Sequence, residues 1–251
     1  MRKFALAAVV VTLALAGCDG SRPSAAVHAS PSPALPSTPE ASAPGTAEPT
    51  AAGWIVLFDG SSPAAFRGYG LDSFPTGWAL EAGSLHALPG AGFDLISRDT
   101  WADFELEFEW RVARGGNSGV IYRVVESDEP SWMTGPEYQV LDDAGHPNGR
   151  DPTTSAAALY DLIAPAADRR LEPVGSFNTG RIVVHDGHVE HWLNGERVVA
   201  YEWGGADVRA LIAASKFRDA AGFMTADVGH VVLQHHGEEA WFRNVRVRPL
   251  P

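Results

Sequence analysis

The segment from Phe104 to Val112 alternates apolar side chains with charged ones over nine consecutive positions. Alternation with a period of two is typical of a β-strand that buries one face and leaves the other in water, whereas a helix repeats about every 3.6 residues. Other apolar runs between residues 53 and 251 are short and are closed by turns rich in Gly and Pro. The pattern therefore predicts an all-β domain built as a sandwich or a barrel.

Two dipeptides predict β-hairpins. Asp186-Gly187 and Asn194-Gly195 each separate two apolar stretches, which is the strongest local sign of a two-residue hairpin loop. The first strand and the two last strands are expected over Trp54–Phe58, Gly229–Gln234 and Ala240–Val247. Helical turns are expected only near Ala156–Tyr160 and Val208–Ala214.

The N-terminus has the features of an export signal. Met1-Arg2-Lys3 is followed by an apolar run to Ala16, and Leu15-Ala16-Gly17-Cys18 resembles the bacterial lipobox. We expect residues 1–17 to be a lipoprotein signal peptide and Cys18 to carry the lipid that holds the protein at a membrane of the cell envelope. An ordinary secretory signal with an incidental cysteine is the alternative. Residues 18–52, rich in Ala, Pro, Ser and Thr, are expected to form a disordered linker before a domain at 53–251.

Charge and cysteine content exclude several classes of partner and site. The formal net charge is −12, so binding to the phosphates of a nucleic acid is not expected. Cys18 is the single cysteine, so the chain forms no internal disulfide and no thiolate metal cluster. GxSxG, P-loop, Rossmann and HExxH motifs do not occur in the sequence.

Three predicted strands carry unusual polar residues opposite their predicted core residues. The core residues are expected to be Val120, Tyr122, Val124, Tyr138, Val140, Val231 and Leu233. By alternation the opposite faces carry Asn117, Arg123, Glu137, Gln139, Gln234 and His236. Planar hydrogen-bonding groups of this kind suit the recognition of hydroxyls, although three ordinary solvated faces would give the same pattern.

Glu137 and His236 form the best candidate acid/base pair of this set. A carboxylate and an imidazole can divide proton acceptance and donation near neutral pH. Arg123 could stabilise an oxyanion or neutralise Glu137, or it could form a purely structural ion pair. Asp142-Asp143 could bind Ca²⁺ or a sugar hydroxyl, or simply form a turn. His185 and His188 should face each other across a hairpin, where an exposed tip and a two-ligand metal site are both compatible with the sequence.

Five segments in chain order resemble the bacterial 3-keto-disaccharide hydrolase domain family over nearly all of residues 53–250. They begin at Trp54-Ile55-Val56-Leu57-Phe58-Asp59-Gly60 and continue through Gly116–Arg123, Gly135–Asp142, His191–Glu196, and Gly229–Gly237 with Trp241–Val245. The resemblance implies a concanavalin A-like jelly-roll β-sandwich. It also implies cleavage of glycosides whose C3 hydroxyl has been oxidised to a ketone, by C2 deprotonation and β-elimination with hydration.

The same resemblance implies roles for the candidate residues. Glu137 and His236 would be the acid and base, in either order, while Arg123, Asn117 and Gln234 would contact hydroxyls or the oxyanion. Gln139, Asp142 and Trp192 would be secondary substrate contacts. His235 replaces the Asp that the family pattern has there, and by alternation it should face away from the site. No cofactor is required for this chemistry, and a divalent metal ion is left open.

Two other functions fit the sequence. A non-catalytic carbohydrate-binding module would hold sugars without consuming them and would tolerate the loss of Glu137. A structural envelope lipoprotein would use the polar face to contact a protein and would have no affinity for sugars.

Overall fold

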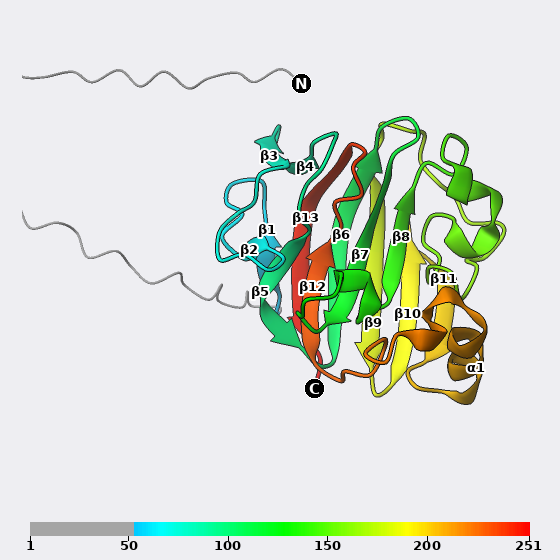
Figure 1. Cartoon of the computed structure of the whole chain (residues 1–251). Helices are drawn as coiled ribbons and strands as arrows, with labels where there is room; N and C mark the ends of the chain where they lie inside the picture. The colour runs from blue at the N-terminus through cyan, green and yellow to red at the C-terminus, as the bar shows by residue number, and fades with distance from the viewer. Residues whose placement is uncertain (1–52) are drawn as a thin grey trace, which may run out of the picture. The chain divides into compact units, whose positions relative to one another are not determined.

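The structure is a computed structural model that describes residues 53–251, and it consists of two antiparallel β-sheets packed face to face (Figure 1). This arrangement confirms the predicted all-β sandwich of the concanavalin A-like type. The predicted signal peptide, Cys18 and the linker lie outside the described residues. Within residues 53–251, no helix has the length and apolar character needed to cross a bilayer.

The larger sheet has eight strands in the order β11-β10-β9-β6-β13-β4-β3, with β1 paired to the second half of β13. Its strands are β1 (Ile55–Phe58), β3 (Trp78–Glu81), β4 (Ser84–Ala87), β6 (Phe104–Val112), β9 (Asn178–His185), β10 (His188–Leu193), β11 (Glu196–Glu202) and β13 (Ala240–Pro249). The two predicted hairpins are confirmed, since Asp186-Gly187 joins β9 to β10 and Asn194-Gly195 joins β10 to β11. All four turn residues have positive φ, as a type I′ turn requires.

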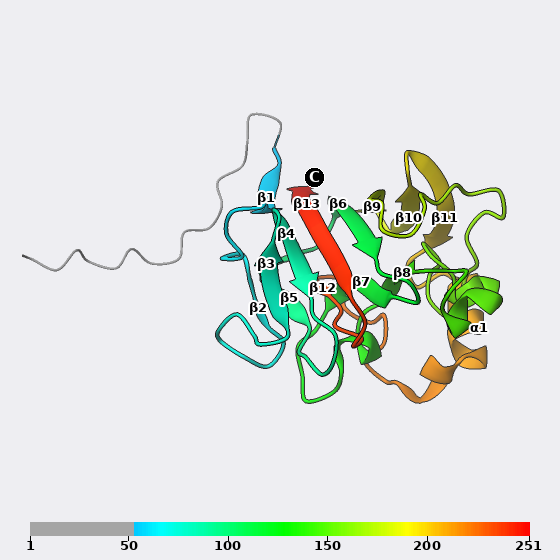
Figure 2. The same ribbon diagram turned by 90° about the horizontal axis from the view of Figure 1, so that it is seen from above.

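The smaller sheet has five strands in the order β2-β5-β12-β7-β8. Its strands are β2 (Phe66–Gly68), β5 (Leu95–Trp101), β7 (Asn117–Val124), β8 (Glu137–Leu141) and β12 (Gly229–Leu233). The helical elements are α1 (Ala206–Ala214) and four short 3₁₀ turns, η1 (Ser131–Met133), η2 (Pro147–Arg150), η3 (Pro152–Thr154) and η4 (Lys216–Asp219). Both views show α1 and the segment after β8 at the side of the sandwich where β8 and β11 form the sheet edges (Figures 1 and 2).

The main core fills the space between the two sheets, and large aromatic residues such as Trp110, Tyr122 and Phe242 are fully buried in it. The predicted helix near Val208 is confirmed by α1, whereas Ala156–Tyr160 forms turns and bridges rather than a helix. Backbone pairing with β8 explains this difference, because Gln139 exchanges hydrogen bonds with Ala157 and Ala158.

A buried polar network in the core holds the segment after β8 against the sandwich. His191 on β10 is fully buried, and burial lowers the pKa of its imidazole to about 4, so the ring is neutral. Its Nδ1 lies 3.1 Å from the Ala157 carbonyl oxygen, which can only accept, and its Nε2 lies 2.9 Å from the Tyr122 hydroxyl. The network therefore fixes the position of residues that close one side of the cavity described next.

Candidate functional site

A cavity of about 210 Å³ lies on the outer face of the smaller sheet, against β7, β8 and the end of β12. We call it the first cavity. Val120, Tyr138 and Leu233 point into the main core, so their neighbours along each strand point outward. The residues that line the first cavity are Asn117, Trp132, Glu137, Gln139, Tyr160, Lys216, Gln234 and His236. Five of the eight predicted catalytic and substrate-binding residues are therefore brought together, from the two strands β7 and β8 and from the segment that follows β12.

Glu137 is the buried carboxyl group of the first cavity. It is 7% exposed, and desolvation raises the pKa of its side chain to about 8, with the positive charge of Lys216 acting in the opposite direction. The carboxyl lies over Gly119 of the neighbouring strand, since a Cβ at Gly119 would come within 2.2 Å of Oε1. A glycine at this position therefore makes room for the carboxyl group.

Amide side chains form the floor of the first cavity. Asn117 is 3% exposed, and its Oδ1 has no hydrogen-bond partner among the described residues. The Gln139 amide is used within the protein, since Nε2 donates to the Thr154 carbonyl at 3.3 Å and Oε1 accepts from the Val140 N–H at 3.0 Å. A buried acceptor without a partner is costly, so Asn117 is the amide best prepared to receive a hydroxyl donor.

His236 lies at the exposed side of the first cavity. Its Nδ1 is 2.7 Å from Oε2 of Glu238, and because a carboxylate only accepts, Nδ1 donates this hydrogen bond. The side chain of His236 is 44% exposed. The carboxylate of Glu238 thus orients the ring, and Nε2 is the nitrogen left to exchange a proton with a ligand.

Lys216 is a cavity residue that the sequence reasoning missed. Its Nζ lies 4.3 Å from the ring centroid of Tyr160 and 5.1 Å from that of Trp132. The residue as a whole is exposed, yet partial desolvation of the ammonium lowers its pKa, while the charges of Glu137 and Asp161 raise it. One signal in the sequence could have found it, since Lys216 is the sole lysine between residues 53 and 251.

Arg123 does not reach the first cavity, so its predicted contact with Glu137 is wrong. The guanidinium donates to the Ala102 carbonyl at 2.9 and 3.1 Å and to Asp103 at 3.0 Å, and it stacks on the ring of Trp203. Arg123 has φ of 51° at a bulge in β7, which breaks the alternation of side chains assumed for the strand. For the same reason Val124 leaves the main core and joins a small cluster with Ile121 on the outer face.

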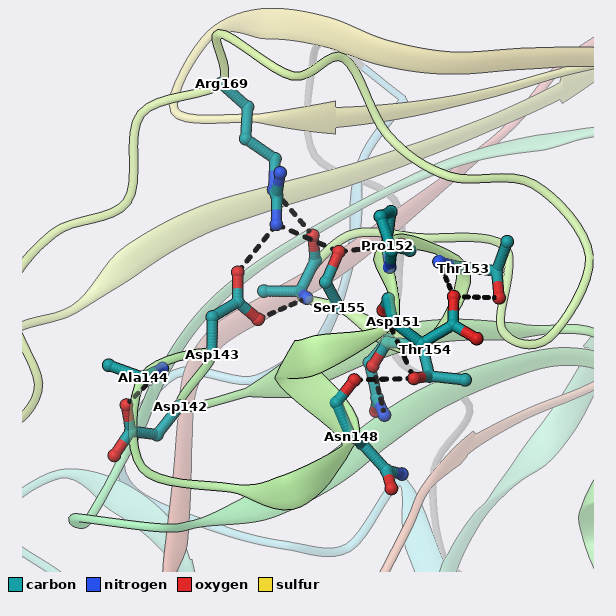
Figure 3. Close-up of polar contacts among 12 residues, drawn as sticks. Asp142, Asp143, Ala144, Asn148, Asp151, Pro152, Thr153, Thr154, Ser155 and Arg169 are labelled. Atoms are coloured by element: carbon teal, nitrogen blue, oxygen red, sulfur yellow. Dashed lines mark hydrogen bonds and ion pairs between the residues drawn. The ribbon is translucent and has the colours of Figure 1, made fainter.

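Asp142 is a turn residue rather than a substrate contact (Figure 3). Its carboxylate accepts the backbone N–H groups of Gly115, Ala144 and Gly145 at 2.7, 3.1 and 3.0 Å, which uses both oxygens. The neighbouring Asp143 pairs with Arg169 at 2.6 Å, so both carboxylates are engaged in contacts within the protein, and neither lines the first cavity.

Trp192 also lies away from the first cavity, on the outer face of the larger sheet. Its indole N–H donates to Glu190 at 2.8 Å, and the guanidinium of Arg181 lies 3.9 Å from the ring centroid. Alternation along β10 explains the placement, because the preceding residue, His191, points into the core.

The predicted histidine pair is opposed as expected, since His185 faces His188 across β9 and β10. His188 bonds to Glu202, while His185 forms with Asp103 and Asp186 the one group of three His, Asp or Glu donors found within 4.8 Å among residues 53–251. Asp103 already accepts hydrogen bonds from Arg123 and from the backbone of Asp186. The divalent metal ion that the sequence leaves open stays untested, and activity measured with and without a chelator would test it.

Comparisons with known proteins agree with this architecture. A family model described as the 3-keto-alpha-glucoside-1,2-lyase-like domain matches residues 53–248. A 3-keto-disaccharide hydrolase of Bacteroides thetaiotaomicron is 36% identical over 229 residues, which cover 79% of each chain. A crystal structure of a putative glycosyl hydrolase from Parabacteroides distasonis superposes with a TM-score of 0.74 at 26% identity, over 80% of this chain and 95% of that one. The family model matches nearly all of the described residues. The chain therefore belongs to the 3-keto-α-glucoside-1,2-lyase-like domain family.

Proposed function

We propose that the protein is an enzyme that cleaves 3-keto-glycosides, with Glu137 as the base that removes the proton on C2. The observation that carries the proposal is a buried carboxyl group, with a pKa raised to about 8, facing a cationic side chain in a cavity lined with amides. A base with a pKa near the working pH is well matched to abstracting a carbon-bound proton. The hydrolase-like activity of the Bacteroides relative supports the same class of reaction.

The first step transfers the C2 proton to the Glu137 carboxylate. The electron pair of the C–H bond moves into the C2–C3 bond, and the C3 carbonyl oxygen becomes an enolate oxygen. A negative charge that develops on oxygen needs a nearby donor or cation. Lys216 supplies the cation in the first cavity and so takes the role that the sequence had suggested for Arg123.

The second step breaks the bond between C1 and its substituent. The enolate re-forms the C3 carbonyl, a double bond forms between C1 and C2, and the C1 oxygen leaves with a proton from His236. His236 suits this role because it lies at the exposed side of the first cavity with its ring oriented by Glu238. Addition of water to C1, with return of the proton to C2, then gives 3-ketoglucose and completes a net hydrolysis.

The test is turnover of 3-keto-trehalose and 3-keto-sucrose by the purified full-length protein, followed by chromatography of released 3-ketoglucose. Glu137→Gln and His236→Ala should each reduce turnover by roughly 100-fold or more, the scale of lost acid/base catalysis. Glu196→Gln is the matched control, because Glu196 is exposed on β11, and it should leave the rate unchanged. Wild-type rates in both cavity variants would remove these two residues from the mechanism.

The turnover assay, together with a binding titration of the same sugars, separates the other two functions. A carbohydrate-binding module would bind these sugars and release nothing, and a structural lipoprotein would not bind them. Equal cleavage of trehalose and sucrose themselves would contradict a mechanism that depends on the C3 ketone, because their C2 proton is not acidic.

A further inference from the structure

Tyr160 is a residue of the first cavity that has no part in the two steps above. It lines the first cavity together with Glu137 and Lys216. Its backbone N–H donates to the Glu137 carbonyl at 3.0 Å, so the segment after β8 holds these two residues next to each other. Any group that reacts with the Glu137 carboxyl group is therefore close to Tyr160 as well.

The chain on either side of Tyr160 has a strained backbone. Ala157 and Asp161 have φ of 66° and 61°, in the left-handed region that residues with a Cβ rarely adopt. Backbone of this kind persists only where surrounding contacts enforce it, and it is concentrated at functional sites. The buried ring of His191, which lies 3.1 Å from the Ala157 carbonyl oxygen, is one such contact. The place of Tyr160 in the cavity wall is thus fixed before a ligand binds.

The hydroxyl group of Tyr160 has a proton to offer. The hydrogen bond that it makes is one that it accepts, from Nδ2 of Asn148 at 3.3 Å, and no residue between 53 and 251 accepts its proton. Burial raises the pKa of this hydroxyl, and the charges of Glu137 and Asp161 raise it further. The group therefore keeps its proton at the pH where Glu137 is deprotonated, and it can donate to a ligand.

Tyr160 and Lys216 place a neutral donor and a positive charge on the same wall. Nζ of Lys216 lies 4.3 Å from the ring centroid of Tyr160. A negative charge that develops on oxygen is stabilised most by donors and charges that are already in position. An ammonium on a flexible stem supplies charge with little directionality, whereas a hydroxyl on a fixed ring supplies a directed hydrogen bond.

Building on the proposed function, we propose that Tyr160 is a catalytic residue whose hydroxyl group donates a hydrogen bond to the C3 oxygen as that oxygen becomes an enolate. The C2 proton goes to Glu137, the electron pair of the C–H bond moves into the C2–C3 bond, and the π pair of the ketone moves onto oxygen. Tyr160 keeps its own proton throughout. Lys216 then supplies the charge that balances the enolate, and Tyr160 supplies the directed contact.

The test isolates proton removal from loss of the C1 substituent. 1,5-Anhydro-3-keto-D-glucitol carries only hydrogens at C1, so its C2 proton can exchange in D₂O while nothing can be eliminated from C1. With the full-length protein, exchange followed by NMR should slow by roughly 100-fold in Tyr160→Phe, the scale of losing one oxyanion donor. Tyr69→Phe is the matched control and should leave exchange unchanged, because Tyr69 is also half-buried, does not line the first cavity and donates its hydroxyl to the Glu129 carbonyl.

A comparison with Glu137→Gln separates this proposal from the proposed function. Glu137→Gln should abolish exchange, and exchange that persists there would contradict Glu137 as the base. Wild-type exchange in Tyr160→Phe, with none in Glu137→Gln, would overturn the role of Tyr160 alone. Slow cleavage of 3-keto-trehalose by Tyr160→Phe with normal exchange would place Tyr160 at the leaving group and would also overturn the proposal.

A binding measurement tests Tyr160 without any reaction. Kojic acid is a planar pyranone whose carbonyl lies beside a hydroxyl-bearing ring carbon, so it resembles the enolised 3-keto sugar. Calorimetric titration should show binding that Tyr160→Phe weakens by roughly tenfold, the scale of one hydrogen bond to a partly charged oxygen, and that Tyr69→Phe leaves unchanged. This result together with no proton exchange would contradict the proposed function and support the donor role. Binding that is absent, or equally tight in the wild type and in Tyr160→Phe, would overturn the donor role.

Discussion

Glu137 and Lys216 have pKa values shifted toward each other by the same cause. Desolvation disfavours the charged form of each side chain, so the pKa of the carboxyl group is raised to about 8 and that of the ammonium is lowered. Their opposite charges partly offset this effect. Burial thus brings the pKa of Glu137 close to neutral pH, which is useful where a carbon acid must be deprotonated.

This pair predicts a specific dependence of activity on pH. Because the base must be deprotonated, the limb of the pH profile on which kcat/KM for 3-keto-trehalose rises should have its midpoint near the pKa of Glu137, about 8. Lys216→Met removes the charge that lowers this pKa, so the midpoint should move to higher pH and the rate at pH 7 should fall. Lys216→Arg retains a positive charge and is the control for that shift. An unchanged midpoint in Lys216→Met would show that Glu137 is not the group that titrates.

A substitution at Gly119 should reduce turnover by displacing the Glu137 carboxyl group. A Cβ there would lie 2.2 Å from Oε1 of Glu137, so Gly119→Ala must displace the carboxyl group. We expect turnover to drop by roughly 100-fold while the far-UV circular dichroism spectrum is retained, because misplacing a base costs about as much as removing it. Gly222→Ala is the control, since the nearest atom to its Cβ would be 3.6 Å away and its φ is not positive. Normal turnover in Gly119→Ala would show that the carboxyl group need not lie over Gly119.

At the scale of elements, the sequence correctly predicted the positions of side chains that lie in regular strands. Alternation predicts Asn117, Glu137, Gln139 and Gln234 on one outer face, because β8 and the relevant parts of β7 and β12 are regular. It fails at Arg123, where Tyr122 and Arg123 together oppose Val231. The Gly229 position accommodates this bulge, since a Cβ there would come within 2.3 Å of the Arg123 backbone.

The contribution of distant elements to the first cavity was not predictable in the same way. Lys216 belongs to η4, a short 3₁₀ turn with no periodicity, and it reaches the first cavity only because the chain folds back beside β8. Trp132 belongs to η1, a second short 3₁₀ turn. Local patterns place residues on the faces of strands, whereas the walls above a face depend on tertiary packing that no local pattern encodes.

At the scale of the whole molecule, the described domain follows an N-terminal segment whose sequence resembles an export signal. The lipobox-like residues Leu15–Cys18 and the segment up to residue 52 lie outside the described structure, so their role rests on the sequence alone. We propose that Cys18 carries lipid and holds the catalytic domain at a membrane of the cell envelope. The acidic charge of the chain, −12, makes attraction to an anionic membrane surface a poor alternative means of attachment.

The anchor predicts a modified N-terminus. Stable attachment takes two or more acyl chains, because a single chain binds membranes only marginally, and Cys18 is the one residue able to carry a thioether-linked diacylglycerol. Intact-mass measurement of the protein from a bacterial host should therefore give a chain that starts at Cys18 with added acyl mass, and labelled palmitate should be incorporated. Cys18→Ser should abolish the labelling, while Ser21→Ala, outside the lipobox, should retain it. A mature chain that starts after Cys18 without acyl mass would identify an ordinary secretory signal. Turnover of 3-keto-trehalose should be the same in either form, because the residues proposed to act on the substrate lie between Asn117 and His236.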